Sequence, residues 1–185
     1  MAKIGLTDFR YGIATEAANG TITYGTPKKP GKAISFTFEP TKSDASLYAD
    51  DALAEHDSSV TGGTCTMGID REDPNTYAEL LGHTVTEGEV VSNTNDVAPY
   101  VGLGRVATLM RDGAYKYRAT FFAKVAFSEP SEENNTRGES VEFGTYEIEG
   151  VVAVPVDGNW RKWKEFDTKA EAISYLESCF TTPSA

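Results

Sequence analysis

Alternation of apolar and polar residues with period two is the feature that most constrains how this chain can fold. The clearest example is AYKYRATFFAKVAF, residues 114–127, where apolar side chains occupy alternate positions from Tyr115 to Phe127. Side chains of a β-strand point alternately to opposite faces, so this pattern predicts one long strand with a single buried face. Such an aromatic stripe can also stack sugars or bases, but the alternation favours packing in a core.

Several other segments show the same alternation. Strands are predicted for AISFTFEP (33–40), for GTCTMGID (63–70) and within VEFGTYEIEGVVAVPV (141–156), where Glu147 and Glu149 fall on the outward face. We expect at least six strands. A mainly β sandwich or barrel is the architecture that this number of strands predicts.

Glycine-containing turns separate these strands. Asp112-Gly113 supplies the left-handed backbone angles of a tight hairpin turn, so residues 100–110 are predicted to pair antiparallel with 114–127. TVTEGEVVS, around Glu87-Gly88, predicts a short second hairpin. SEPSEENNTRGES, residues 128–140, lacks apolar periodicity and is predicted to be an exposed loop.

Two helices interrupt the β pattern. The first is predicted over 74–81, because Asp73 can cap it, Pro74 suits its first turn and Gly82 can end it. We expect this short helix to cover an open end of the β core. A C-terminal helix is predicted from the capping-box spacing of Thr168 and Glu171. Its apolar stripe consists of Ala172, Ile173, Leu176 and Cys179 or Phe180.

Composition limits the classes of function. The length of 185 residues suits one domain, and the formal net charge of −11 argues against binding nucleic acid through phosphate neutralisation. Cys65 and Cys179 have no metal-binding or redox spacing, so both are expected to be reduced thiols. Neither a signal-peptide h-region nor an apolar run of membrane-spanning length is present, which predicts a soluble protein made in a cytoplasm.

The segment SLYADDALAEHDSS, residues 46–59, gathers four carboxylates and His56. In an extended strand neighbouring side chains point to opposite faces, so these groups do not converge as a metal or catalytic site requires. The spacing of an EF-hand loop is absent too. We therefore interpret the segment as a solvated loop or an interface edge.

Other candidate sites also have structural explanations. His83 follows the first predicted helix, where a cation is favoured by the helix dipole, and no catalytic partner is evident. Gly102 and Gly104 form G-x-G without the third glycine and the following helix of a phosphate-binding loop. Acid pairs such as Glu132/Glu133 and Glu147/Glu149 suit glycoside hydrolysis only if they face each other across a cleft. The sequence thus nominates no catalytic, cofactor-binding or metal-binding residue.

Six landmarks occur in a specific order from about Ala2 to Trp163: KIGLTDFRYG, ITYGTPKK, SLYADD, YAELLGHTV, NDVAPYVGLG and VEFGTYEIEGVVA. Together they resemble the phage major tail tube protein family of the phi-thirteen type, found in long-tailed phages and prophages. The resemblance implies a tail-tube-type β-sandwich or flattened barrel over residues 1–163, flanked by a short helix. Residues 164–185 then form a C-terminal helical extension and polar tail.

The resemblance also implies a function. Subunits of this family form hexameric rings that stack into a hollow virion tail tube, through which DNA passes without specific binding. By analogy, residues 41–60, with Leu47, Tyr48, Asp50 and Asp51, are expected at a subunit interface, and 128–140 is a second candidate loop. Glu147 and Glu149 are candidates for the lumen, where like charge keeps phosphates from adhering.

The implied partners are further copies of the chain and other tail proteins, such as the tail terminator and tape measure proteins. The resemblance implies no membrane anchoring, no cofactor and no metal. Two alternatives remain open at this point: a β-sandwich binding or adhesion module, and a glycoside hydrolase that uses a carboxylate pair.

Overall fold

The computed structural model describes residues 2–49, 52–132 and 145–181, and it confirms a mainly β fold with a short helix and a C-terminal helix. The elements are β1 (Ala2–Glu16), β2 (Ile22–Tyr24), β3 (Ala33–Ala49), β4 (Ala52–Ile69), α1 (Pro74–Leu81), β5 (Thr84–Thr86), β6 (Glu89–Val91), β7 (Tyr100–Arg111), β8 (Ala114–Phe127), β9 (Tyr146–Ala153), β10 (Arg161–Phe166) and α2 (Lys169–Thr181). Within the described part of the chain, neither helix is long and apolar enough to cross a membrane.

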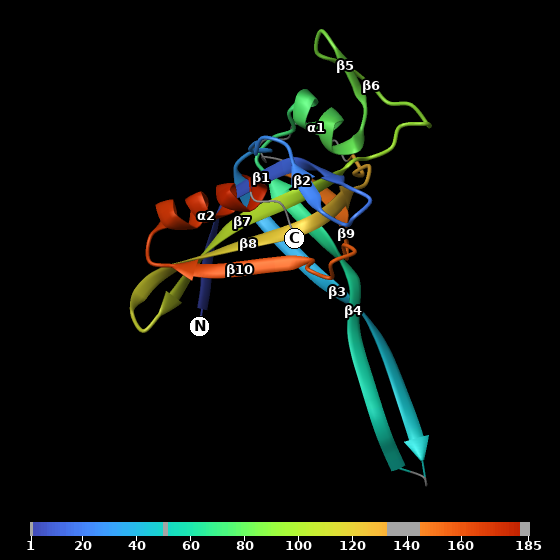
Figure 1. Ribbon diagram of the computed structural model, residues 1–185. Coiled ribbons are helices and arrows are strands. Elements are labelled where there is room, and N and C mark those ends of the chain that lie inside the picture. The colour runs from blue at the N-terminus through green and yellow to red at the C-terminus, as the bar shows by residue number, and fades with distance from the viewer. Residues whose placement is uncertain (1, 50–51, 133–144, 182–185) are drawn as a thin grey trace, which may run out of the picture.

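One antiparallel sheet contains most of the strands, in the order β2-β1-β7-β8-β9-β4-β3, and β10 also pairs with β8. The long strand β8 joins two parts of this sheet, because its residues 117–122 pair with β10 and its residues 125–127 pair with β9. The sheet bends there, so that β1, β7, β8 and β10 face β3, β4 and β9 (Figure 1). The core lies between these two layers and includes Phe9, Leu103 and Phe122 from one and Met67 and Ile148 from the other.

A β-bulge corrects the predicted face assignment of β8. Val101 pairs with Val125, but Leu103 pairs with Phe122, so β8 contains one extra residue between these two pairs. The extra residue reverses the alternation. As a result Phe121 lies on the outer side of the sheet, whereas Phe122, Val125 and Phe127 lie in the core between the layers. The prediction that Tyr115 to Phe127 share one face is therefore wrong beyond the bulge.

Helix α1 begins and ends as its sequence predicts. Asp73 accepts a hydrogen bond from the backbone N–H of Thr76 at 3.0 Å, and Gly82 ends the helix with a φ of 79°. Leu80 and Leu81 are buried in the core between the two layers. The helix thus closes one end of the sandwich, as expected (Figure 1).

Helix α2 covers the outer side of the layer that contains β7 and β8. Its predicted capping box forms, with the backbone N–H of Glu171 donating to Thr168 Oγ1 at 3.3 Å and that of Thr168 donating to Glu171 Oε2 at 3.2 Å. Leu176 is fully buried, and a Cβ on Gly104 would lie 3.1 Å from it. Gly104, the second glycine of the G-x-G sequence in β7, therefore allows close packing of the helix. The expected division at residue 163 falls within β10, so the C-terminal segment is part of this fold.

Candidate functional site

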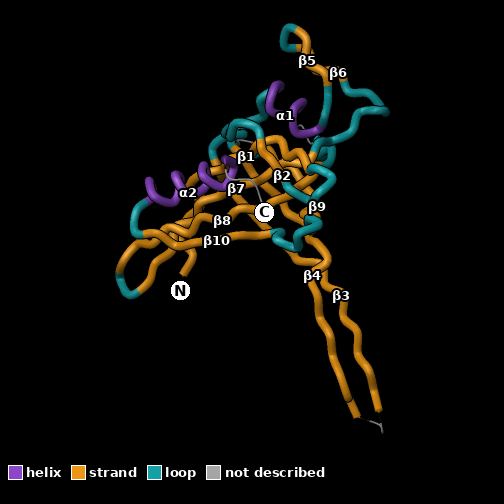
Figure 2. Tube along the Cα trace, in the orientation of Figure 1, coloured by secondary structure: helices purple, strands orange, loops and turns teal. Residues whose placement is uncertain are grey.

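Strands β3 and β4 extend beyond the sandwich as a two-stranded arm. Their pairing continues to Ala49 opposite Ala52, but β9 pairs with β4 only over Gly62–Ile69. Residues 42–49 and 52–60, which we call the arm, pair only with each other and project away from the rest of the molecule (Figures 1 and 2). At about 3.3 Å per residue, the arm reaches roughly 25 Å beyond the sandwich.

The arm has no support from the described part of its own chain. Residues 42–44 near its base are exposed, as are Ser58 and Ser59 on the opposite strand. An isolated two-stranded hairpin is only marginally stable in water, and its unpaired edges can accept further strands or other protein surfaces. The outer backbone edges of the arm are therefore open to pairing.

This finding corrects the interpretation of residues 41–60 as a loop. In its described part, the segment consists of paired strands. Leu47 and Tyr48 lie near the tip of β3, opposite Glu55 and Leu53. Asp50 and Asp51 lie outside the described residues, as do residues 133–140 of the second candidate loop.

The outward face of β3, β4 and β9 is a second uncovered surface. The register places its side chains beside one another across the three strands. This polar sheet face consists of Ser35, Thr37, Glu39, Thr64, Thr66, Glu147, Glu149 and Val151. Glu147 and Glu149, predicted to point outward, are both exposed. Hydroxyls and carboxylates dominate the face, and none of these eight side chains is basic.

His83 lies in a cluster of hydrogen bonds that the sequence did not indicate. Its Nδ1 is 2.8 Å from Asp96 Oδ2, its Nε2 is 3.0 Å from Glu129 Oε2, and its side chain is only 6% exposed. The hydroxyl of Tyr77 donates to the other oxygen of Glu129. The cluster joins the end of α1 to the segment before β7 and to the end of β8. These partners are 13 and 46 residues from His83, too distant for local spacing to reveal.

Both carboxylates favour the charged form of the ring. Only a doubly protonated imidazolium donates from both nitrogens. The hydrogen bond to Asp96 raises the pKa of His83 above its ordinary value, and Glu129 adds to the rise. The pKa of the Asp96 carboxyl is lowered by His83, and that of Glu129 by the Tyr77 hydroxyl and then by His83. A general base needs a free ring nitrogen, so this geometry suits a structural link rather than proton transfer.

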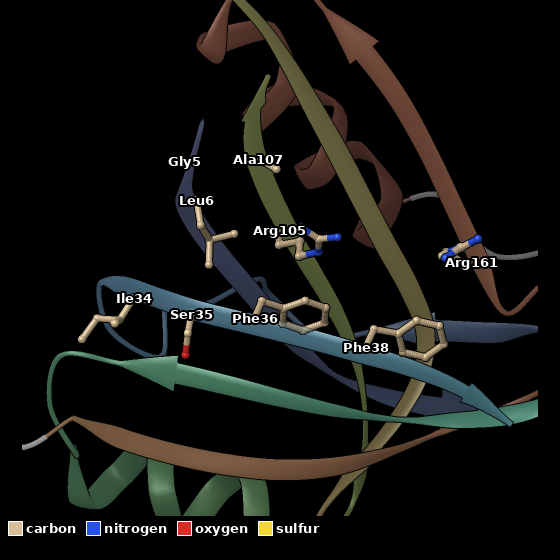
Figure 3. A pocket seen from close by; sticks show the side chains of 9 residues that line it. All are labelled: Gly5, Leu6, Ile34, Ser35, Phe36, Phe38, Arg105, Ala107 and Arg161. Atoms are coloured by element: carbon tan, nitrogen blue, oxygen red, sulfur yellow. The ribbon is translucent and has the colours of Figure 1, made fainter. Parts of the chain in front are cut away.

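A pocket of about 340 Å³ opens between β3 and the layer formed by β1, β7 and β10 (Figure 3). We call it the arginine pocket, because Arg105 and Arg161 line it together with Leu6, Ile34, Phe36 and Phe38. The Arg105 guanidinium lies 4.6 Å from the centre of the Phe36 ring. Burial, with Arg118 and Arg161 nearby, lowers the pKa of Arg105 to about 10, so the guanidinium stays charged near neutral pH.

The positions of the described carboxylic acids do not favour the glycoside hydrolase alternative. None of the residues that line the arginine pocket is a carboxylic acid. Glu147 and Glu149 are neighbours on one exposed sheet face, whereas glycoside hydrolysis needs two acids on opposite sides of a bound sugar. Over the described ranges, no group of three or more His, Cys, Asp or Glu side chains has the geometry to hold a metal ion.

Cys65 and Cys179 are both free thiols, and Cys65 is buried in the core. Burial raises the pKa of the Cys65 thiol to about 12, which keeps it protonated and unreactive.

Comparison with known proteins adds no functional residue, because neither a protein-family model nor a curated protein matches this chain.

Proposed function

We propose that this chain is a structural subunit of a phage tail tube, which self-assembles into stacked hexameric rings and forms a conduit for DNA. The proposal joins the ordered sequence landmarks to one structural observation: an arm that projects from the sandwich and has no partner in the described part of its own chain. Under this proposal the protein is made in the bacterial host cytoplasm and resides in the virion tail. Its partners are further copies of itself and other tail proteins, such as terminator and tape measure proteins.

The arm supports self-assembly on physical grounds. Ordering about twenty residues into strands costs conformational entropy, and burial within the subunit does not offset it. Contact with a neighbouring subunit supplies the missing burial. A ring or stack of identical subunits presents such a contact to every arm. The alternatives are a binding or adhesion module and a carboxylate-based glycoside hydrolase, and neither requires contact between copies of the chain.

The polar sheet face supports a wall along a DNA path. Carboxylates repel phosphates, and hydroxyls and glutamates offer no cation that would hold a phosphate. Glu39 lies on this face on β3, and Glu147 and Glu149 lie on it on β9, with β4 between the two strands. The proposal therefore places Glu147 and Glu149 at the lumen, with the net charge of −11 acting in the same direction.

Electron microscopy of the purified protein, with sedimentation analysis over a range of concentrations, tests the proposal. We expect rings or tubes with an axial hole. A protein that stays monomeric at high concentration would reject the assembly function and favour a binding module.

The double variant Asp50→Ala/Asp51→Ala tests the role of the two acids that follow β3 in the sequence. We expect it to reduce assembly while the circular dichroism spectrum and melting temperature of the subunit stay unchanged, because the described core is built from other parts of the chain. Glu87→Ala in the turn between β5 and β6 is the matched control, since it removes an exposed acid far from the arm along the chain. Normal tube formation by the double variant would exclude these two acids from the subunit contact.

A further inference from the structure

The arginine pocket contrasts in charge with the rest of the molecule. The chain has a net charge of −11, yet Arg105 and Arg161 line this pocket and Arg118 lies near Arg105. Glu165 pairs with Arg118 at 2.7 Å and with Arg111 at 3.2 Å. Of the ion pairs between described residues, none involves Arg105 or Arg161. In the described part of this acidic chain, the two arginines that line the pocket thus have no carboxylate partner.

The surroundings of these arginines define a ligand class. Arg105 lies over Phe36, and Arg161 lies 5.8 Å from the centre of the Phe38 ring (Figure 3). Arg161 also lies 4.6 Å from the centre of the Trp160 ring. The buried Nε of Arg105 has no hydrogen-bond partner within the described part of the chain. Arginine binds carboxylates through paired N–H groups, and aromatic walls favour an apolar neighbour. The pocket therefore suits a carboxylate flanked by apolar side chains.

The arm of this same chain has that chemistry. Residues 41–60 contain the acids Asp44, Asp50, Asp51, Glu55 and Asp57 and a single lysine, Lys42. Leu47, Tyr48 and Leu53 lie between them. Because the arm projects away from its own sandwich, it is presented to a different molecule (Figure 2).

We propose that the arginine pocket of one subunit receives a carboxylate from the acidic arm of a second copy of this chain. The inference rests on the proposed self-assembly and adds the acceptor surface to it. Neutralisation of Arg105 and Arg161 by an arm acid would give these arginines the ion pair that they lack among the described residues, and would give the arm a supporting surface. The contact is heterologous, since the arm of one copy meets the pocket of the next.

A charge swap tests the contact. Arg161→Glu places an acid at the pocket, and Asp50→Lys/Asp51→Lys reverses the charge of the arm tip. Each change alone is expected to raise the concentration needed for assembly about tenfold or more, because like charges then face each other. A chain that carries both changes presents opposite charges again, and we expect its assembly to return to within about threefold of the unchanged protein.

The matched control is Lys164→Glu, which reverses a charge on the opposite face of the same strand, β10. It is expected to assemble normally, and unfolding curves confirm that every variant is folded. If the unchanged protein assembles and Arg161→Glu assembles equally well, the pocket contact is rejected while the tube function stands. Failure of the combined variant to recover rejects the arm as the occupant. A monomeric unchanged protein rejects both proposals.

Discussion

The sandwich and the arm are built from the same two strands but have different sources of stability. Over Ala33–Thr41 and Gly62–Ile69, β3 and β4 contribute Phe36, Phe38 and Met67 to the core or its margin. Beyond these residues the strands pair only with each other. Burial of apolar surface stabilises the first part, at about 25 cal/mol per Å². The second part has backbone pairing within the hairpin but no third strand beside it, so folding and proposed assembly depend on different residues of one hairpin.

A cavity in the sandwich is expected to have the largest effect on stability. Phe122 is 1% exposed and lies 5.7 Å from Phe36 and 5.1 Å from Phe38 between ring centres. Phe122→Ala should lower the free energy of unfolding by about 3–5 kcal/mol, because it removes a large side chain from a packed site. For a domain of this size the melting temperature then falls by about 10 °C.

Thermal unfolding followed by circular dichroism measures this effect. Tyr115→Ala on the same strand is the control, since Tyr115 is 57% exposed and its loss should change stability by less than about 0.5 kcal/mol. Equal melting temperatures for the two variants would contradict the assignment of the core.

The link between His83 and its two carboxylates is expected to have a smaller, pH-dependent effect. A raised pKa in the folded state means that the stabilising contribution is fully present below the ordinary histidine value of 6.5 and is lost as pH rises through the folded value. His83→Gln should therefore lower the melting temperature by a few degrees, about 2–4 °C, at pH 6 and by less at pH 9.

The groups that face the ring are Asp96, Glu129 and Tyr77. Lys28→Gln is the control, because it breaks the ion pair of Lys28 with Glu79 without removing a histidine. Its effect is expected to be the same at pH 6 and pH 9, since histidine is the side chain that ordinarily changes charge in this range. If His83→Gln lowers the melting temperature by the same amount at pH 6 and pH 9, the ring acts through packing alone.

The sequence predicted features that depend on neighbouring residues. The capping of α1 by Asp73 and Gly82 and the hairpin at Asp112-Gly113 need only local chemistry, and both are observed. Features that depend on distant contacts were missed. The partners of His83 come from other segments, and the strand β10, with sequence RKWKEF, lies at a sheet edge and lacks clear alternation.

The bulge in β8 shows the same limit, because the reversal of faces after Phe122 is visible only in the register with β7. The arm was missed for a different reason. Sequence periodicity reports the burial of one face of a strand, and residues 46–49 and 52–59 lack such periodicity although their backbones pair as strands.

Removal of the arm is expected to have the smallest effect on stability and the largest on the proposed assembly. Lys42 pairs with Val60, so replacing residues 43–59 with Asn-Gly closes the hairpin with a tight turn at this pair. We expect the free energy of unfolding to change by less than about 1 kcal/mol, because no core contact is lost and shortening a loop has a small entropic effect. Thermal unfolding measures this change, and sedimentation of the same sample measures assembly. A melting temperature as low as that of Phe122→Ala would make the arm part of the folding unit. Rings formed without the arm would assign the subunit contact to other surfaces.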